Sequence, residues 1–200
     1  MRIVKIRFNR LLRSSASILA LLFATAGHAE SLTLEQLMHS LAKAKPSHAT
    51  FTEIKHIALL DQPVESSGEL FFTAPDHLEK RTLLPKPESL IVDGNKILIE
   101  RGSKTYYFTL QNMPELGAFI NSIRGTLAGD LNALKRSFQL SLKGNTKQWT
   151  LQLAPTNEKM QKILQHINIA GFNDQVHSIE IFQADGDSSL MAIKPMDSKQ

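Results

Sequence analysis

Histidines are the side chains of this sequence best suited to chemistry, because an imidazole can bind a metal or transfer a proton near neutral pH. The chain has seven histidines and no cysteine. No two histidines are four residues apart, the spacing of a metal pair on a helix, although His48 and His56 would share a face within one strand. We therefore predict no metal and no cofactor. We interpret the six histidines after residue 29 as solvent-facing or hydrogen-bonded: His39, His48, His56, His77, His166 and His177.

The familiar catalytic motifs are missing from the sequence. It has no Gly-x-Ser-x-Gly turn, no His-Glu-x-x-His helix, no phosphate-binding glycine loop and no cysteine nucleophile. We therefore expect a protein that is not an enzyme, with catalysis by an unrecognised site as the alternative.

The first 29 residues have the pattern of a secretory signal peptide. Five basic residues come first, residues 18–26 are apolar, and Gly27-His28-Ala29 is a small-x-small cleavage site. Cleavage after Ala29 would leave a single exported domain, residues 30–200.

Removal of this segment changes the charge of the chain. Lysine plus arginine would fall from 23 to 18 against 19 acidic residues, which takes the net charge from +4 to about −1. A protein without excess positive charge lacks the electrostatic footprint of a nucleic-acid binder. We therefore expect no nucleic-acid partner.

Residues 68–94 contain regularly spaced turn residues between short apolar segments. Proline lacks a backbone N–H, so Pro75 and Pro85 belong at strand ends, and Asp93-Gly94 suits a tight hairpin. Gly68, inside a strand, indicates a bulge. Continued along the chain, the pattern predicts 11 strands: 49–60, 65–73, 77–84, 89–92, 96–100, 104–110, 138–143, 148–154, 163–170, 176–184 and 188–194.

Helical periodicity occurs in two places. Thr33 and Gln36 form a candidate capping box before an amphipathic helix that ends near Lys45-Pro46. Residues 113–137 predict two helices broken around residues 125–129. The fold class is therefore α+β, mainly β: a half-open, curved antiparallel sheet, or incomplete barrel, with helices over its concave face.

Apolar side chains from the sheet and the helices should meet under this cover. Strand parity and helical spacing select Leu37, Leu41, Phe51, Leu70, Phe72, Leu78, Leu90, Leu98, Phe119, Ile123, Leu127 and Leu134. They either pack as a solid core or line a cavity, and the residue types are the same in both cases.

The spacing in residues 68–94, with the strand Ser47 to Glu53 before it, resembles the outer-membrane lipoprotein carrier (LolA-like) family. Residues 122–131 resemble a LolA-related branch of it. The resemblance implies an open cavity for acyl chains, in a monomeric periplasmic carrier of acylated lipid or lipoprotein cargo between an inner-membrane exporter and an outer-membrane acceptor. It also implies that Leu78 contacts the exporter. A lipid-sensing or interaction module of the same fold is the alternative.

The sequence departs from the carrier pattern at two positions. Ala74 stands where the family has an arginine that locks the lid by hydrogen bonding, and Lys80 stands where a tryptophan follows. We expect the helical segment 119–127 to be the lid, without that arginine to hold it.

Overall fold

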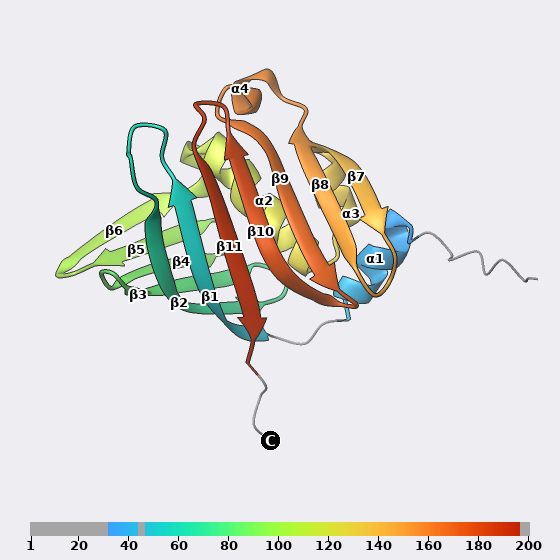
Figure 1. The fold of residues 1–200 in the computed structure, drawn as a ribbon, viewed down its shortest axis with the longest axis horizontal. Coiled ribbons are helices and arrows are strands. Elements are labelled where there is room, and N and C mark those ends of the chain that lie inside the picture. Colours follow the sequence, from blue (N-terminus) through green and yellow to red (C-terminus); the bar gives the residue numbers. More distant parts are fainter. Residues whose placement is uncertain (1–31, 44–46, 197–200) are drawn as a thin grey trace, which may run out of the picture.

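The computed structural model describes residues 32–43 and 47–196 (Figure 1). The predicted signal peptide lies outside the described residues. Among the described residues, no helix is long and apolar enough to cross a membrane.

Eleven strands form one antiparallel sheet that stays open, as the sequence predicts. Its order is β6-β5-β4-β3-β2-β1-β11-β10-β9-β8-β7, so the N-terminal half (β1–β6) is a meander and β1 joins it to the C-terminal half through β11. The strands are β1 (Ser47–His56), β2 (Val64–Thr73), β3 (His77–Leu84), β4 (Glu88–Asp93), β5 (Lys96–Arg101), β6 (Lys104–Thr109), β7 (Phe138–Gly144), β8 (Trp149–Pro155), β9 (Leu164–Phe172), β10 (Gln175–Gln183) and β11 (Ser188–Pro195).

The turn residues lie where the sequence places them. Pro75 and Pro85 fall between strands, and Gly94 has a φ of 55°, as the tight turn between β4 and β5 requires. The β2–β3 register shifts between Ser67 and Gly68, which confirms the predicted irregularity. A Cβ on Gly68 would meet the Arg81 carbonyl oxygen at 1.9 Å, so only glycine fits this close approach.

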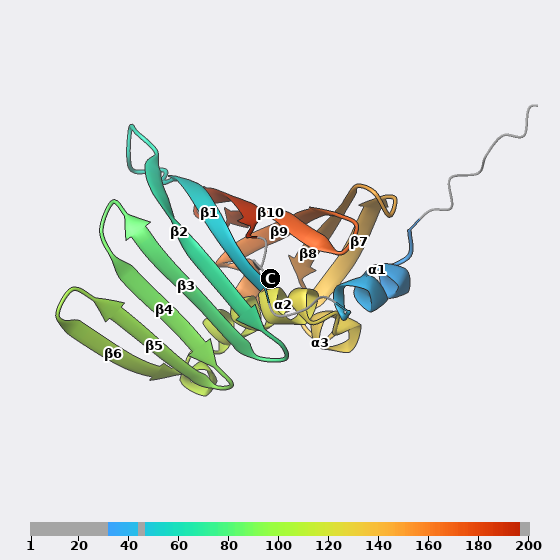
Figure 2. The same cartoon turned by 90° about the horizontal axis from the view of Figure 1, so that it is seen from below.

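The helices connect the two open edges of the sheet. After β6 the chain forms a 3-10 turn, η1 (Leu110–Asn112), then α2 (Pro114–Leu127) and α3 (Leu131–Lys135), before it enters β7. Because β6 and β7 are opposite edges, this connection has to cross the sheet, and Figure 2 shows α2 and α3 lying between the two halves. Helix α1 (Leu34–Leu41) begins at the predicted Thr33 capping box, and α4 (Glu158–Gln161) was not predicted.

The break between the two central helices lies at Ala128–Asp130, at the C-terminal end of the predicted range 125–129. Gly125 is inside α2, where a Cβ would meet Leu134 Cδ2 at 3.1 Å, so its small size serves helix packing. Gly129 has a φ of +68°, and a Cβ there would be 2.2 Å from the Met38 carbonyl oxygen of α1. The chain therefore turns where α1 packs against it.

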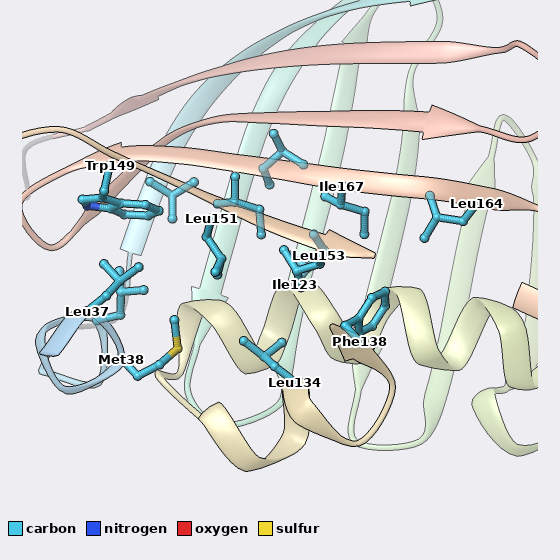
Figure 3. Packing of buried hydrophobic residues seen from close by; sticks show 14 of the residues in the cluster. Leu37, Met38, Ile123, Leu134, Phe138, Trp149, Leu151, Leu153, Leu164 and Ile167 are labelled. Atoms are coloured by element: carbon cyan, nitrogen blue, oxygen red, sulfur yellow. The ribbon is translucent and has the colours of Figure 1, made fainter. Parts of the chain in front are cut away.

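Two clusters of buried hydrophobic residues hold the helices to the sheet. The larger joins α1, α2 and α3 to the C-terminal half of the sheet and includes Trp149, Leu151 and Ile167, whose side chains point towards the helices in Figure 3. The smaller joins α2 to the N-terminal half through Val92, Ile97, Leu110 and Ile120. Leu78 and Phe119 pack against both clusters.

Leu134→Ala should destabilise the protein by about 2–5 kcal/mol, because Leu134 is fully buried at the junction of α3 with α2 and the truncation leaves a cavity. Urea unfolding followed by the fluorescence of Trp149, the one tryptophan of the chain, measures the change. Leu59→Ala is the matched control, since Leu59 is 94% exposed and should lose less than about 0.5 kcal/mol. Equal losses in the two variants would contradict this description of the core.

Candidate functional site

A cavity of about 1070 Å³ lies on the concave side of the sheet, beside α2. This volume reaches the upper end of the range found for small-molecule sites, about 300–1,000 Å³. Both halves of the sheet and α2 contribute apolar side chains to its lining. They include Leu70, Leu78, Leu90, Phe119, Ile123, Ile181, Met191 and Ile193.

Several of the lining side chains are only partly buried although they face inward. Leu70, Leu90, Ile181, Met191 and Ile193 are of this kind. Ile181 and Ile193 pack against the larger core cluster, and Leu90 packs against the smaller one. The molecule therefore has both a packed core and an apolar cavity next to it.

The structure brings eight of the twelve predicted cavity residues to the cavity wall: Leu41, Leu70, Phe72, Leu78, Leu90, Phe119, Ile123 and Leu127. Leu37 and Leu134 are instead in the packed cluster. Phe51 is buried under the Lys80 ammonium, whose nitrogen is 4.8 Å from the ring centroid. Lipid binding by any of them stays a prediction, as does docking of an exporter at Leu78.

Leu98 was predicted to face the cavity, and this prediction is wrong. Ile97 pairs with Val92 and is buried in the cluster beneath α2, so Leu98 lies on the opposite, convex face. Lys96-Ile97-Leu98-Ile99 has three consecutive apolar residues, and such a run shows no alternation that would set the parity.

Sequence reasoning missed the contribution of the C-terminal strands to the cavity. β10 supplies Ile179 and Ile181, and β11 supplies Met191 and Ile193. The alternation of apolar residues at these positions was a usable signal, since side chains two apart on a strand share a face.

A charged group interrupts the apolar wall. Glu53 on β1 is 4% exposed, and its Oε2 lies 2.5 Å from Lys80 Nζ and 3.3 Å from Ser66 Oγ, while its Oε1 lies 3.6 Å from Lys55 Nζ. Glu53, Lys55 and Lys80 all line the cavity. This part of the apolar wall thus carries one carboxylate and two ammonium groups, and Glu115, Asp174 and Asp187 also line the cavity.

Arg124 ties α2 to the turns of the N-terminal half. Its Nη1 donates to the carbonyl oxygens of Asp76 at 2.8 Å and Gly94 at 2.7 Å, and its Nη2 donates to Asn121 Oδ1 at 2.5 Å. Burial lowers the pKa of Arg124, while the Asp76 and Asp93 carboxylates act in the opposite direction. The β2–β3 and β4–β5 turns are thereby held to the helix.

A hydrogen-bond donor between α2 and the sheet is therefore present, although Ala74 supplies none. It comes from the helix, and the acceptors belong to the sheet turns. Two further polar side chains of α2 bond within the helix, since Ser122 donates to the Phe119 carbonyl and Thr126 to the Ser122 carbonyl. Their hydroxyl groups can consequently be buried without a partner on the sheet.

Among the described residues, His39 lies on α1, and the other histidines are spread over four strands of the sheet. His48 stacks on Phe71 with ring centroids 4.2 Å apart, and His166 stacks on Phe182 at 4.4 Å. Within residues 32–43 and 47–196, no three His, Asp or Glu side chains are grouped so that they could hold a metal ion.

Comparison with known proteins gives one extensive match. A family described as "Outer membrane lipoprotein carrier protein LolA-like" matches residues 26–194. No curated protein matches the chain at a significant level.

Solved structures with a similar fold share little sequence with this chain. A LolA superfamily protein from Nitrosomonas europaea is 8% identical, with a TM-score of 0.46 over 84% of this chain and 96% of that one. A chain of the MucA/MucB complex from Pseudomonas aeruginosa is 12% identical, with a TM-score of 0.44 over 80% of this chain and 55% of that one. A chain of the complex between the CwlD amidase from Clostridioides difficile and the GerS lipoprotein is 12% identical, with a TM-score of 0.39 over 83% of this chain and 92% of that one.

Proposed function

The chain belongs to the LolA-like family of outer-membrane lipoprotein carrier proteins, and we propose on this basis that it is a periplasmic carrier of acylated cargo. The cargo would be a lipoprotein or another lipid-linked molecule, taken from an inner-membrane exporter and passed towards the outer membrane. The observation that carries the proposal is the cavity of about 1070 Å³ with partly exposed apolar side chains on its wall.

The energetics of such a cavity favour uptake of an acyl chain. Each methylene removed from water contributes about 0.8 kcal/mol, so about ten buried methylenes give about 8 kcal/mol. This corresponds to a Kd near 1 μM before the cost of immobilising the chain is subtracted. A carrier of this kind needs no covalent chemistry, but it does need a way to release its cargo.

Helix α2 is suited to control that release. Phe119, Ile123 and Leu127 present apolar side chains to the cavity, and Arg124 on the same helix holds the β-turns. In the proposal, cargo displaces this segment and breaks the Arg124 bonds, and re-formation of the bonds favours release. We call the form in which Arg124 bonds the β-turns the latched form. The latched form therefore has the lower affinity for cargo.

Binding of an uncharged fluorophore tests the carrier proposal directly. Diphenylhexatriene fluoresces in apolar surroundings, so its titration into the protein should give saturable binding of one molecule per chain. A long-chain alcohol should displace it competitively. Absence of saturable binding by protein that shows cooperative unfolding would overturn the proposal.

A further inference from the structure

Glu53, Lys55 and Lys80 form a charged group in the wall of the mainly apolar cavity, and Ser66 donates a hydrogen bond to Glu53. A buried ion pair is weak support for stability, because well-packed apolar residues can often replace it without loss. A cavity that bound only hydrocarbon would gain nothing from it. We therefore expect the group to take part in recognition of the cargo.

The hydrogen-bonding capacity of the group is unevenly used. Both Glu53 oxygens have partners, since Oε2 accepts from Lys80 and Ser66 and Oε1 lies near Lys55. An ammonium has three N–H donors, and among the described residues Lys80 uses one of them, on Glu53. The spare capacity is consequently that of donors. The formal charge of this group of two lysines and one glutamate is +1, while Glu115, Asp174 and Asp187 also line the cavity.

The donors of Lys80 lie next to apolar side chains of the cavity wall. Lys80 is paired with Leu70 on β2 and with Leu90 on β4, and all three line the cavity. Two residues along β3, Leu78 has the same orientation and packs, as does Phe119 of α2, against the cluster beneath α2. A continuous apolar path thus leads from the ammonium group of Lys80 to α2.

We propose that Lys80, with Lys55 beside it, binds the anionic head of an amphiphilic cargo, a carboxylate or a phosphate, whose chain lies along Leu78 towards α2. Glu53 positions the Lys80 ammonium and is not itself the ligand-binding group. This inference rests on the proposed carrier function and specifies the chemical class of the cargo. A neutral or cationic head would leave the donors of Lys80 unused or would be repelled by them.

Three probes with the same alkyl chain test the proposal: a fatty acid, the alkyl phosphate and the fatty alcohol, each displacing diphenylhexatriene at neutral pH. The fatty acid or the alkyl phosphate should bind at least about tenfold more tightly than the alcohol, because hydrogen bonds to charged groups are the stronger ones. The preferred head then distinguishes a carboxylate cargo from a phosphate one.

Substitutions assign the effect to the side chains. Lys80→Met should abolish the preference for the anionic head and leave binding of the alcohol within about twofold, since a methionine preserves most of the apolar stem. Glu53→Gln should strengthen the preference, because it removes the carboxylate that competes for the ammonium. If Lys80→Met unfolds because Glu53 is left unpaired, the double variant Lys80→Met with Glu53→Gln gives the same test.

Arg81→Met is the matched control. Arg81 neighbours Lys80 on β3, faces the other side of the sheet and pairs with the buried Glu79 carboxylate, so its loss also breaks an ion pair. It should keep the head-group preference. Equal binding of all three probes would overturn the head-group site and leave the carrier proposal standing, whereas binding of none would overturn the carrier proposal itself.

Discussion

Ile193→Trp is expected to weaken binding of an acyl chain by at least about tenfold. Ile193 lies on β11, lines the cavity and is only partly buried, so the larger indole would occupy space that the chain otherwise takes. Exclusion of about two methylenes costs about 1.6 kcal/mol, which is more than tenfold in Kd. Displacement of diphenylhexatriene by a fatty alcohol measures the loss.

The same variant also distinguishes an open cavity from a packed core. Overpacking of a filled core costs about 1–3 kcal/mol, whereas an indole placed in free space should leave the free energy of unfolding unchanged or raised. Ala192→Trp is the matched control, because Ala192 is the next residue of β11 and is exposed on the opposite face. Equal loss of binding in both variants would contradict the position of the cavity.

Arg124→Met is expected to raise the affinity for an acyl chain by about 10- to 100-fold and to slow its release. The substitution removes the bonds to the Asp76 and Gly94 carbonyls that hold α2 in the latched form. Hydrogen bonds from a charged donor contribute about 1.5–3 kcal/mol, so the equilibrium should shift towards the open form by a similar amount. Equilibrium titration and stopped-flow release of diphenylhexatriene give the two quantities.

Two controls accompany this substitution. Arg136→Met removes an exposed arginine just after α3 and should change neither affinity nor release. Arg124→Lys keeps the charge but loses the fork of donors, so its affinity should fall between those of wild type and Arg124→Met. A lower affinity in Arg124→Met, with the fold retained, would show that α2 is a fixed wall of the cavity and not a lid.

The strands were predictable because their ends carry local signals. Proline, Asp-Gly and the alternation of apolar residues act over a few positions, and they placed all eleven strands within a few residues of their observed bounds. The helix break was predicted to within a few residues, and the two glycines of that range have different uses. Gly125 lets α3 approach α2, whereas Gly129 supplies the positive φ of the turn.

The site was less predictable because it depends on pairings distant in sequence. Glu53 and Lys80 are brought together by the registers of β1 with β2 and of β2 with β3, which no local pattern reveals. The partners of Arg124 are backbone carbonyls of two turns, so no complementary side chain marks them in the sequence. Leu98 was assigned to the wrong face because side chains alternate along a strand, so an error of one residue moves every side chain to the other face.

The most direct measurement is native mass spectrometry of the full chain, purified without detergent from the cell envelope of its own host, with extraction and identification of any bound molecule. The carrier proposal predicts one acylated molecule per chain, lost from Ile193→Trp and retained by Ala192→Trp. Wild-type protein that is isolated empty, and that takes up neither diphenylhexatriene nor a fatty acid, would contradict it and favour an interaction module of the same fold.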